Sequence, residues 1–252
     1  MTKIRWGALC WILCAMVYPA QIAAALQWPQ KYSWSQNLIS DLGVTACGMY
    51  DAGTRVERGI CSPWHLMANA STVGNGLLLA AGCALLWSAW PNLRLGRIAL
   101  GFLAVGGLLL AAVGILPLDL HPDGHNAAAL LQAVFQWCGM GLLILAVRSK
   151  SEYRAVAGLT AAVLLVSVVG FALFITAVGG QPAVPGLGLG LTERIAFDSL
   201  NLWGVGTALL LLRIQPIQPI QPAALSPESS AAASDAASGV RSHHWRTPSG
   251  GN

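Results

Sequence analysis

The stretch DLHPDGHN, residues 119–126, places two histidines and two aspartates between two long apolar segments. His121 and His125, with Asp119 nearby, carry the kinds of donor atom that bind divalent metals such as zinc. The proline and glycine between the histidines prevent the regular helical spacing of many metal sites. Single interfacial histidines that make hydrogen bonds in a turn are therefore the alternative, and the sequence leaves both interpretations open.

A second stretch, SWSQNLISDLG at residues 33–43, follows the first apolar segment. Asp41, together with His125 and His65, has the side-chain chemistry of general acids and bases. Ser40 has the hydroxyl of a nucleophile or of a substrate-binding residue, although Ser-Asp pairs are also typical of turns and caps. The sequence contains no nucleophile-elbow, zinc-protease or phosphate-loop motif, so it predicts acid–base chemistry without naming a reaction.

Polar side chains recur at helical spacing in three apolar segments. Positions i, i+4 and i+7 share one helix face, and polar groups are costly against lipid. We therefore expect the three stripes to line one wet cleft, where Ser40, Asn69 and Glu193 bind a substrate. The stripes are His65, Asn69, Thr72 and Gly76; His125, Ala129, Gln132 and Gln136; and Arg194, Asp198 and Asn201.

Arg194 and Asp198 are the charged pair in the last stripe, one helical turn apart. In the cleft, Asp198 would contribute to substrate binding and Arg194 would hold an anionic headgroup. A structural ion pair between them is the alternative. For the amides and hydroxyls of the stripes, the alternative is hydrogen bonding between neighbouring helices.

The composition indicates a membrane protein. Of the 252 residues, 55% are hydrophobic and 10% are charged, whereas soluble domains carry about 25% charged residues. Mean hydropathy is +0.61. We predict an all-α membrane protein, a six-transmembrane-helix bundle over residues 1–213, with no nucleic acid partner. The predicted crossings are residues 6–26, 64–90, 98–117, 126–147, 155–178 and 192–212.

The distribution of Lys and Arg predicts the orientation. With the N-terminus inside, most of these residues fall on the cytoplasmic side, as the positive-inside rule requires. Both termini are therefore predicted to be cytoplasmic, in the cytoplasmic membrane of a bacterium. The first segment also resembles a cleavable signal peptide, but its length and the five segments after it favour an uncleaved helix. Seven of the ten acidic residues fall on the outer side: Asp41, Asp51, Glu57, Asp119, Asp123, Glu193 and Asp198.

Two of the six cysteines, Cys47 and Cys61, fall in the long outer loop. If that compartment is oxidising, a disulfide between them would close a short loop and make it more rigid. Two free thiols are the alternative. The other cysteines lie within apolar segments, where a thiol usually packs as a small hydrophobic side chain.

The chain after residue 213 has a different composition, with a tandem I-Q-P repeat followed by residues rich in Ser, Ala and Pro. Proline at every third position prevents a helix. The remainder has too few apolar side chains to form a core. We therefore predict that residues 214–252 are a disordered cytoplasmic tail.

Four stretches together resemble a known family: SWSQNLISDLG, SPWHLMANAS, GILPLDLHPDGHN and GLTERIAFDSLNLWG. Over residues 5–213 the chain resembles the bacterial multi-pass membrane family called "domain of unknown function 998", which implies six helices and no established activity. The I-S-D-x-G element is distantly similar to the eukaryotic membrane family of lipid-anchor remodelling factors and autophagy modulators. Alkaline ceramidases and adiponectin receptors also use Ser, Asp and His at a membrane face, but they have seven spans and a histidine pair in the last helix.

Two functions from different classes fit these features. The first is an enzyme acting on a lipid headgroup, for which Asp41, His125 and His65 supply acid–base groups and helix N-termini favour phosphate. The second is a non-catalytic binding protein, transporter or assembly factor. In both cases we expect the bilayer and a lipid or small amphiphile to be the partners, and the sequence leaves the cofactor unknown.

Overall fold

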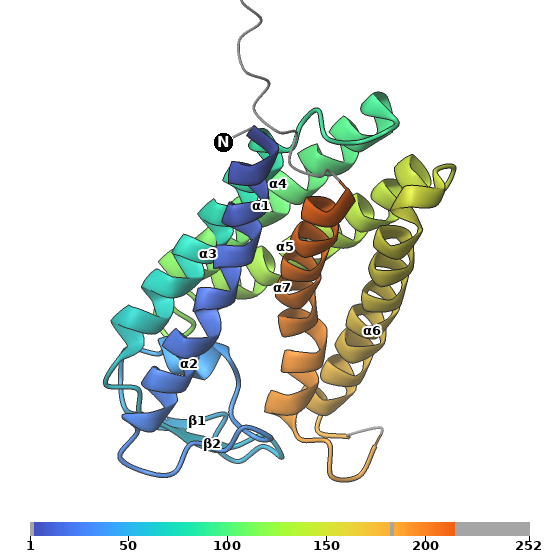
Figure 1. Cartoon of the computed structure of the whole chain (residues 1–252). Coiled ribbons are helices and arrows are strands. Elements are labelled where there is room, and N and C mark those ends of the chain that lie inside the picture. The colour runs from blue at the N-terminus through green and yellow to red at the C-terminus, as the bar shows by residue number, and fades with distance from the viewer. Residues whose placement is uncertain (1–2, 182–183, 215–252) are drawn as a thin grey trace, which may run out of the picture. The chain divides into compact units, whose positions relative to one another are not determined.

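The computed structural model describes residues 3–181 and 184–214, so almost all of the predicted tail, from residue 215 on, lies outside the described residues. Long helices make up most of the structure, and one short hairpin lies in the loop after the first two (Figure 1). The elements in chain order are α1 (Lys3–Leu13), η1 (Cys14–Met16), α2 (Val17–Leu26), η2 (Ser40–Gly43), β1 (Gly48–Tyr50), β2 (Arg58–Ile60), α3 (His65–Leu85), α4 (Leu93–Ile115), α5 (Pro122–Val147), η3 (Ser151–Tyr153), α6 (Arg154–Val178) and α7 (Leu189–Ile214).

Five helical segments of the described chain are long and apolar enough to cross a membrane, which supports the multi-pass class. The sixth predicted crossing, residues 64–90, corresponds to α3, which has 21 residues but is not one of the five. Its sequence contains several amides and hydroxyls, which lower its hydropathy. The five segments are Lys3–Leu26, Leu93–Ile115, Pro122–Val147, Ser151–Val178 and Leu189–Ile214.

Local sequence explains where the helices begin and end. The Asn92 side chain accepts a hydrogen bond from the Leu95 amide at 3.1 Å and thereby caps the start of α4. Pro117 comes directly after Leu116, the C-cap residue of α4, and Pro122 begins α5, where its missing N–H has no cost. The turn between α4 and α5 therefore has a fixed length, and it places His125 in the first turn of α5.

Close packing of helices surrounds the buried centre of the bundle. Trp11 and Trp203 are fully buried with ring centroids 5.5 Å apart, and they join α1 to α7. Gly76 on α3 lies against Gly107 and Ala111 on α4, and a Cβ atom at Gly76 would lie 2.3 Å from the Gly107 carbonyl oxygen. Small residues here let two helices approach closely, as in other membrane bundles.

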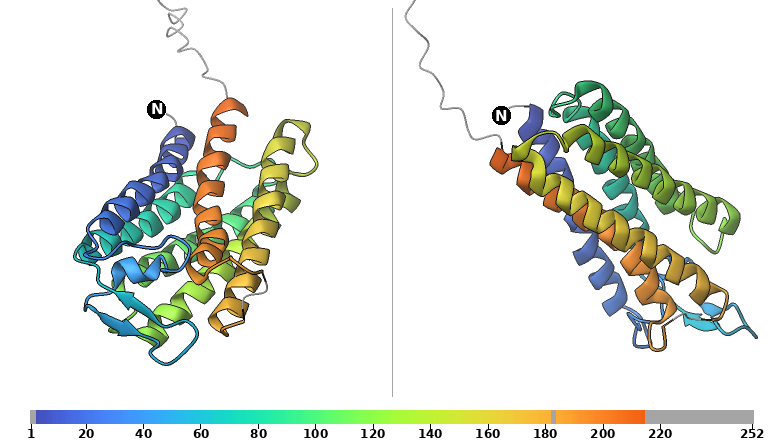
Figure 2. Two further views of the ribbon diagram at one scale, coloured as in Figure 1. Left: turned by 90° about the horizontal axis from the view of Figure 1, so that it is seen from below. Right: turned by 90° about the vertical axis from the view of Figure 1, so that its right-hand side faces the viewer.

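The loop between α2 and α3 folds over one end of the helices, where η2 and the β1–β2 hairpin lie (Figure 1). Figure 2 shows the hairpin at this end. Cys47 and Cys61 form a disulfide bond. Arg58 donates to both carboxylate oxygens of Asp41, at 2.8 and 2.9 Å, and also pairs with Asp51. Because Asp41 is completely buried, this ion pair fixes η2 to the hairpin.

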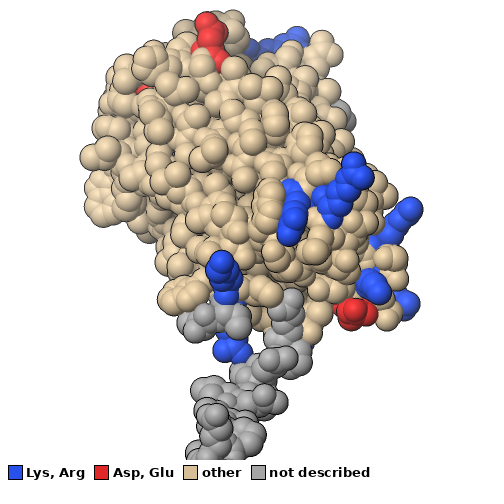
Figure 3. Space-filling view, turned by 90° about the horizontal axis from the view of Figure 1, so that it is seen from above, with Lys and Arg blue, Asp and Glu red and all other residues tan. Residues whose placement is uncertain are grey.

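The N-terminal end of α1 lies at the opposite end, together with the α3–α4 and α5–α6 turns (Figure 1). Viewed from there, Figure 3 shows several Lys and Arg side chains at the surface and few acidic ones. The basic residues of these segments agree with a cytoplasmic placement under the positive-inside rule. The orientation itself stays a prediction. The Lys and Arg residues of these segments are Lys3, Arg5, Arg94, Arg97, Arg148, Lys150 and Arg154, and Arg213 lies in the last turn of α7.

Candidate functional site

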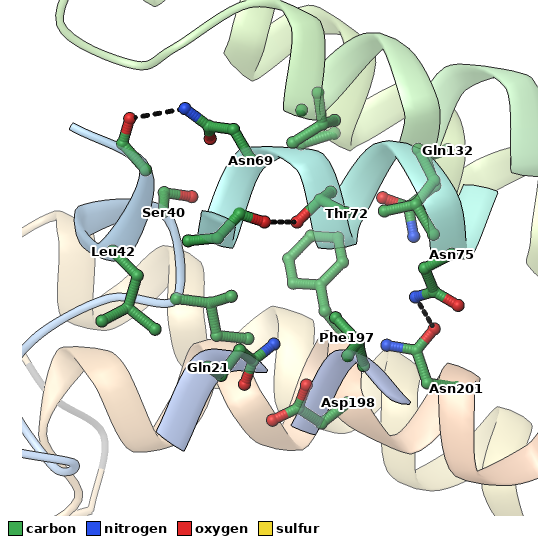
Figure 4. Close-up of a pocket in the computed structure, with 18 of the residues that line it drawn as sticks. Gln21, Ser40, Leu42, Asn69, Thr72, Asn75, Gln132, Phe197, Asp198 and Asn201 are labelled. Carbon is green, nitrogen blue, oxygen red and sulfur yellow. Dashed lines mark hydrogen bonds between the residues drawn. The ribbon is translucent and has the colours of Figure 1, made fainter. Parts of the chain in front are cut away.

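A pocket of about 80 Å³ lies among α2, η2, α3, α4, α5 and α7. Its lining combines polar side chains with apolar ones such as Leu42 and Phe197 (Figure 4). The pocket contains members of all three polar stripes, so residues that are far apart in the sequence meet at one site. The polar lining residues are Gln21, Ser40, Asn69, Thr72, Asn75, His125, Gln132, Glu193, Asp198 and Asn201.

Ser40 is held between a histidine and a carboxyl group at this site. The Nε2 atom of His125 lies 3.0 Å from the Ser40 Oγ atom, and its Nδ1 atom lies 2.7 Å from the Leu116 carbonyl oxygen. On the other side, Ser40 Oγ lies 3.1 Å from the Oε1 atom of Glu193. The Ile39 amide donates to the other oxygen of Glu193. A continuous chain of hydrogen bonds thus joins α5, η2 and α7.

The positions of the protons in this chain follow from which of its groups can donate and which can only accept. The Leu116 carbonyl can only accept, so Nδ1 of His125 must carry a hydrogen. Ser40 has one hydroxyl hydrogen and cannot donate to both neighbours. All contacts are satisfied if His125 is neutral and Glu193 is protonated, or if His125 is charged and Glu193 is ionised. In both arrangements the chain holds one shared proton and no net charge, which suits the burial of His125 and Glu193.

Two of the predicted acid–base residues do not line this pocket. Asp41 binds Arg58, and its Oδ2 atom also accepts a hydrogen bond from the Leu38 amide at 2.8 Å. His65 lies at the start of α3, with Nδ1 3.0 Å from the Ser62 carbonyl oxygen. The structure therefore gives Asp41 a role in loop folding, and of the three predicted residues only His125 lines the pocket.

The predicted metal ligands His121, His125 and Asp119 do not come together. The Asp119 carboxylate accepts hydrogen bonds from the Thr45 amide at 3.0 Å, the Thr45 hydroxyl at 2.6 Å and the Ala46 amide at 3.2 Å. Over residues 3–181 and 184–214, no group of three or more His, Cys, Asp or Glu residues could hold a metal ion. The turn between α4 and α5 instead serves to fasten the loop.

Arg194 does not line the pocket either, although Asn69, Glu193 and Asp198 do. Its guanidinium group donates to the carbonyls of Asn37 at 2.9 Å and Trp34 at 3.2 Å, and it lies over the Trp34 ring. These contacts leave Arg194 at the loop instead of in an ion pair with Asp198. The expected cation for an anionic headgroup is therefore absent from the pocket lining.

Two pocket residues, Gln21 and Asn75, were not among the residues that the sequence singled out. Gln21 in α2 lines the pocket beside Asp198 (Figure 4). The amide nitrogen of Asn75 donates to the side-chain oxygen of Asn201 at 2.9 Å. Asn75 lies three residues after Thr72, on the same helix face, so the spacing of the stripe could have identified it. Gln21 is an amide within an apolar helix, which is a comparable signal.

Comparison with known proteins identifies the family but no activity. No curated protein and no solved structure matches the chain. A family model described as "Protein of unknown function (DUF998)" matches residues 12–210, a range that includes the whole pocket lining from Val17 to Asn201. The match also spans the loop that carries Ser40 and the turn that carries His125. The chain belongs to this DUF998 family of integral membrane proteins of unknown function.

Proposed function

We propose that the protein is an integral membrane enzyme that acts on the polar headgroup of a membrane lipid, with Ser40 as nucleophile and His125 as its base. The observation that carries this proposal is the 3.0 Å contact between His125 Nε2 and Ser40 Oγ inside a polar pocket. A serine becomes nucleophilic when an adjacent base can accept its proton. A base that is itself oriented by a further hydrogen bond is the usual arrangement, and here the Leu116 carbonyl orients His125.

The reaction would proceed by transfer of a group to Ser40. As the Ser40 oxygen forms a bond to the carbon or phosphorus of a headgroup ester, its proton passes to His125 Nε2. The bond to the leaving oxygen then breaks, and that oxygen takes the proton from His125. Water or a second acceptor alcohol, deprotonated by His125, removes the group and restores the Ser40 hydroxyl. Glu193 is protonated in the arrangement that has a neutral His125, so it keeps its own proton and donates a hydrogen bond to Ser40 Oγ while the Ser40 proton resides on His125.

Three features support a lipid as the source of the substrate. The pocket lies within a helical bundle that includes five candidate membrane-spanning segments. It is lined by Ser40 of the loop, so it is close to the end of the bundle where the chain leaves the helices. A volume of about 80 Å³ suits a headgroup fragment and is too small for a whole lipid.

A non-catalytic lipid carrier is the second candidate, and Asp198 favours it. This carboxyl group is within α7, a candidate membrane crossing, and it lines the pocket without a direct ion pair to Arg194 among the described residues. Ionisable groups inside membrane helices often mark binding sites and transport pathways. A carrier would need Asp198 but would not need the Ser40 hydroxyl.

Lipid analysis of cells that lack the gene tests the proposal. Such cells would be complemented with the wild-type chain, Ser40→Ala or His125→Gln, each at wild-type protein levels. An enzyme predicts that both variants leave the altered lipid composition of the deletion cells uncorrected. Matched controls are Ser71→Ala and His65→Gln, since neither residue lines the pocket, and both should restore the wild-type composition. Full restoration by Ser40→Ala would contradict the proposal.

A further inference from the structure

The side chains that line the pocket are acidic or uncharged, apart from one histidine, His125. Among the described residues that line the pocket, Glu193 and Asp198 are the carboxylic acids, and there is no lysine or arginine. The nearest candidate cation in sequence, Arg194, donates to carbonyl groups of the loop and to the Tyr32 hydroxyl. The Glu193 carboxyl group is balanced by the shared proton of the His125 chain. Asp198 has no cation beside it among the lining residues of the described chain.

The wall opposite Ser40 also contains hydrogen-bond acceptors that lack donors. Within the described part of the chain, the Oδ1 atoms of Asp198 and Asn75 are buried and have no hydrogen-bond partner. Asn75 is only 3% exposed. An unsatisfied buried acceptor costs on the order of 1–3 kcal/mol, and more when it is charged. A bound group that donates hydrogen bonds would satisfy these acceptors.

The arrangement of these side chains indicates what such a group must offer. Figure 4 shows Gln21, Asp198 and Asn201 on one side of the pocket, with Asn75 adjoining Asn201. A carboxylate beside carbonyl oxygens of amides attracts a positive charge that carries N–H donors. A phosphate or carboxylate would instead be repelled by Asp198. A quaternary ammonium has the charge but no N–H group, and its three methyl groups add bulk in a cavity of about 80 Å³.

We propose that this part of the pocket binds a primary ammonium group, with Asp198 as its counter-ion and Asn75 as a hydrogen-bond acceptor. Phosphatidylethanolamine in the membrane and a free small amine both carry this group. The proposal rests on the proposed function in one respect: the ammonium would hold a headgroup so that its ester reaches Ser40. Binding of the ammonium itself requires neither Ser40 nor His125.

Lipid retention by the purified full-length protein tests this specificity. The protein would be placed in nanodiscs with equal amounts of phosphatidylethanolamine, phosphatidylcholine and phosphatidylglycerol, and the retained lipids identified by native mass spectrometry. We expect selective retention of phosphatidylethanolamine, with about tenfold weaker retention in Asp198→Asn, since loss of one charged hydrogen bond corresponds to that factor. Asp123→Asn is the matched control, because Asp123 is an exposed acid outside the pocket.

Further measurements separate the sources of the amine and the two proposals. Displacement of the lipid by free ethanolamine supports the ammonium site, as does binding of ethanolamine without phosphatidylethanolamine, which identifies a soluble ligand. Ser40→Ala should keep the selectivity for phosphatidylethanolamine, whether or not Ser40 has a catalytic role. Three outcomes would overturn the inference: equal retention of all three lipids, preference for phosphatidylglycerol, or unchanged retention in Asp198→Asn. Water would then be the donor to the Asp198 and Asn75 oxygens.

Discussion

The Nε2 atom of His125 lies 3.0 Å from the Oγ atom of Ser40, although 85 residues separate them in the sequence. Ser40 is in the loop after α2, and His125 is in the first turn of α5. Their contact therefore exists only while the loop is docked on the helices. The interactions that dock the loop consequently control the site, and they can be tested independently of any activity.

The first prediction concerns the buried ion pair. Arg58→Met leaves the Asp41 carboxylate buried without its cation, which should destabilise the docked loop by about 3–5 kcal/mol. Burial alone lowers the pKa of Arg58, but the hydrogen bonds and charges of Asp41 and Asp51 raise it overall, so Arg58 stays charged. Hydrogen exchange of the Leu38 amide, which donates to Asp41, should accelerate in the variant.

Arg55→Met is the control for this substitution. Arg55 is exposed and donates to the Gly180 carbonyl at 3.3 Å, so its loss should change the exchange of the Leu38 amide little. Equal exchange rates in Arg58→Met and the wild type would show that the ion pair does not hold the loop.

The second prediction is a pH dependence of the loop contact at Asp119. Burial raises the pKa of Asp119, but hydrogen bonds from the Thr45 hydroxyl and the amides of Thr45 and Ala46 lower it overall below its usual value. A lowered pKa in the folded state means that the contact contributes fully above the pKa of the unfolded chain. The contribution is lost as pH falls through the lower, folded-state pKa.

Hydrogen exchange of the Thr45 and Ala46 amides, corrected for intrinsic rates, should therefore show less protection in acid than at pH 7. Asp119→Asn is the matched variant, because its side chain keeps one acceptor oxygen but does not titrate in this range. We expect weaker protection and no acid-dependent loss in this variant. Protection that is independent of pH in the wild type would contradict the assigned role of Asp119.

The third prediction compares two glycines on α3. Gly76→Ala places a Cβ atom 2.3 Å from the Gly107 carbonyl oxygen and 2.4 Å from the Ala111 amide nitrogen, so α3 and α4 must separate. We expect the unfolding free energy to fall by several kcal/mol, which is at least the usual cost of overpacking a protein core. Thermal unfolding in detergent would measure it.

Gly74 provides the internal control, because nothing lies within 4 Å of a Cβ atom added there. Gly74→Ala should stabilise the helix by about 0.5–1 kcal/mol, since alanine restricts the unfolded chain. A Gly76→Ala protein as stable as Gly74→Ala would show that the α3–α4 contact is looser than described.

The fourth prediction concerns orientation. If both termini are cytoplasmic, green fluorescent protein fused after Asn252 should fluoresce, and alkaline phosphatase at the same position should be inactive, when the fusions are made in bacterial cells. The loop with Cys47 and Cys61 would then lie in the oxidising compartment, where its disulfide can form. The reverse pattern of reporter activity would place the pocket at the cytoplasmic face.

The sequence was sufficient to predict the helices and much of the polar lining. Continuous apolar segments predicted six crossings, and five of them are membrane-crossing candidates in the described structure. Regular spacing selected Asn69, Gln132 and Asp198, which line one pocket. Helical periodicity works here because each stripe is a local property of one helix. The same periodicity did not reveal that Arg194 turns to the loop, since that depends on carbonyl groups more than 150 residues away.

The contribution of the loop could not be predicted in the same way. Ser40 and Asp41 are adjacent, yet one lines the pocket and the other is buried against Arg58. Which of the two faces the pocket depends on the conformation of η2 and the position of the hairpin, and no periodic pattern encodes either. The composition of the turn between α4 and α5 likewise suggested metal ligands, whereas Asp119 accepts hydrogen bonds from the loop.

The most direct test of the site is covalent labelling of Ser40. The protein in detergent or nanodiscs would be treated with a fluorophosphonate, which reacts with activated serine hydroxyls, and the modified residue identified by mass spectrometry. We predict modification of Ser40 in the wild type, a rate at least about 100-fold lower in His125→Gln because its general base is lost, and an unchanged rate in His65→Gln. Labelling of Ser40 that is absent, or equally fast without His125, would contradict the central claim that this histidine activates this serine.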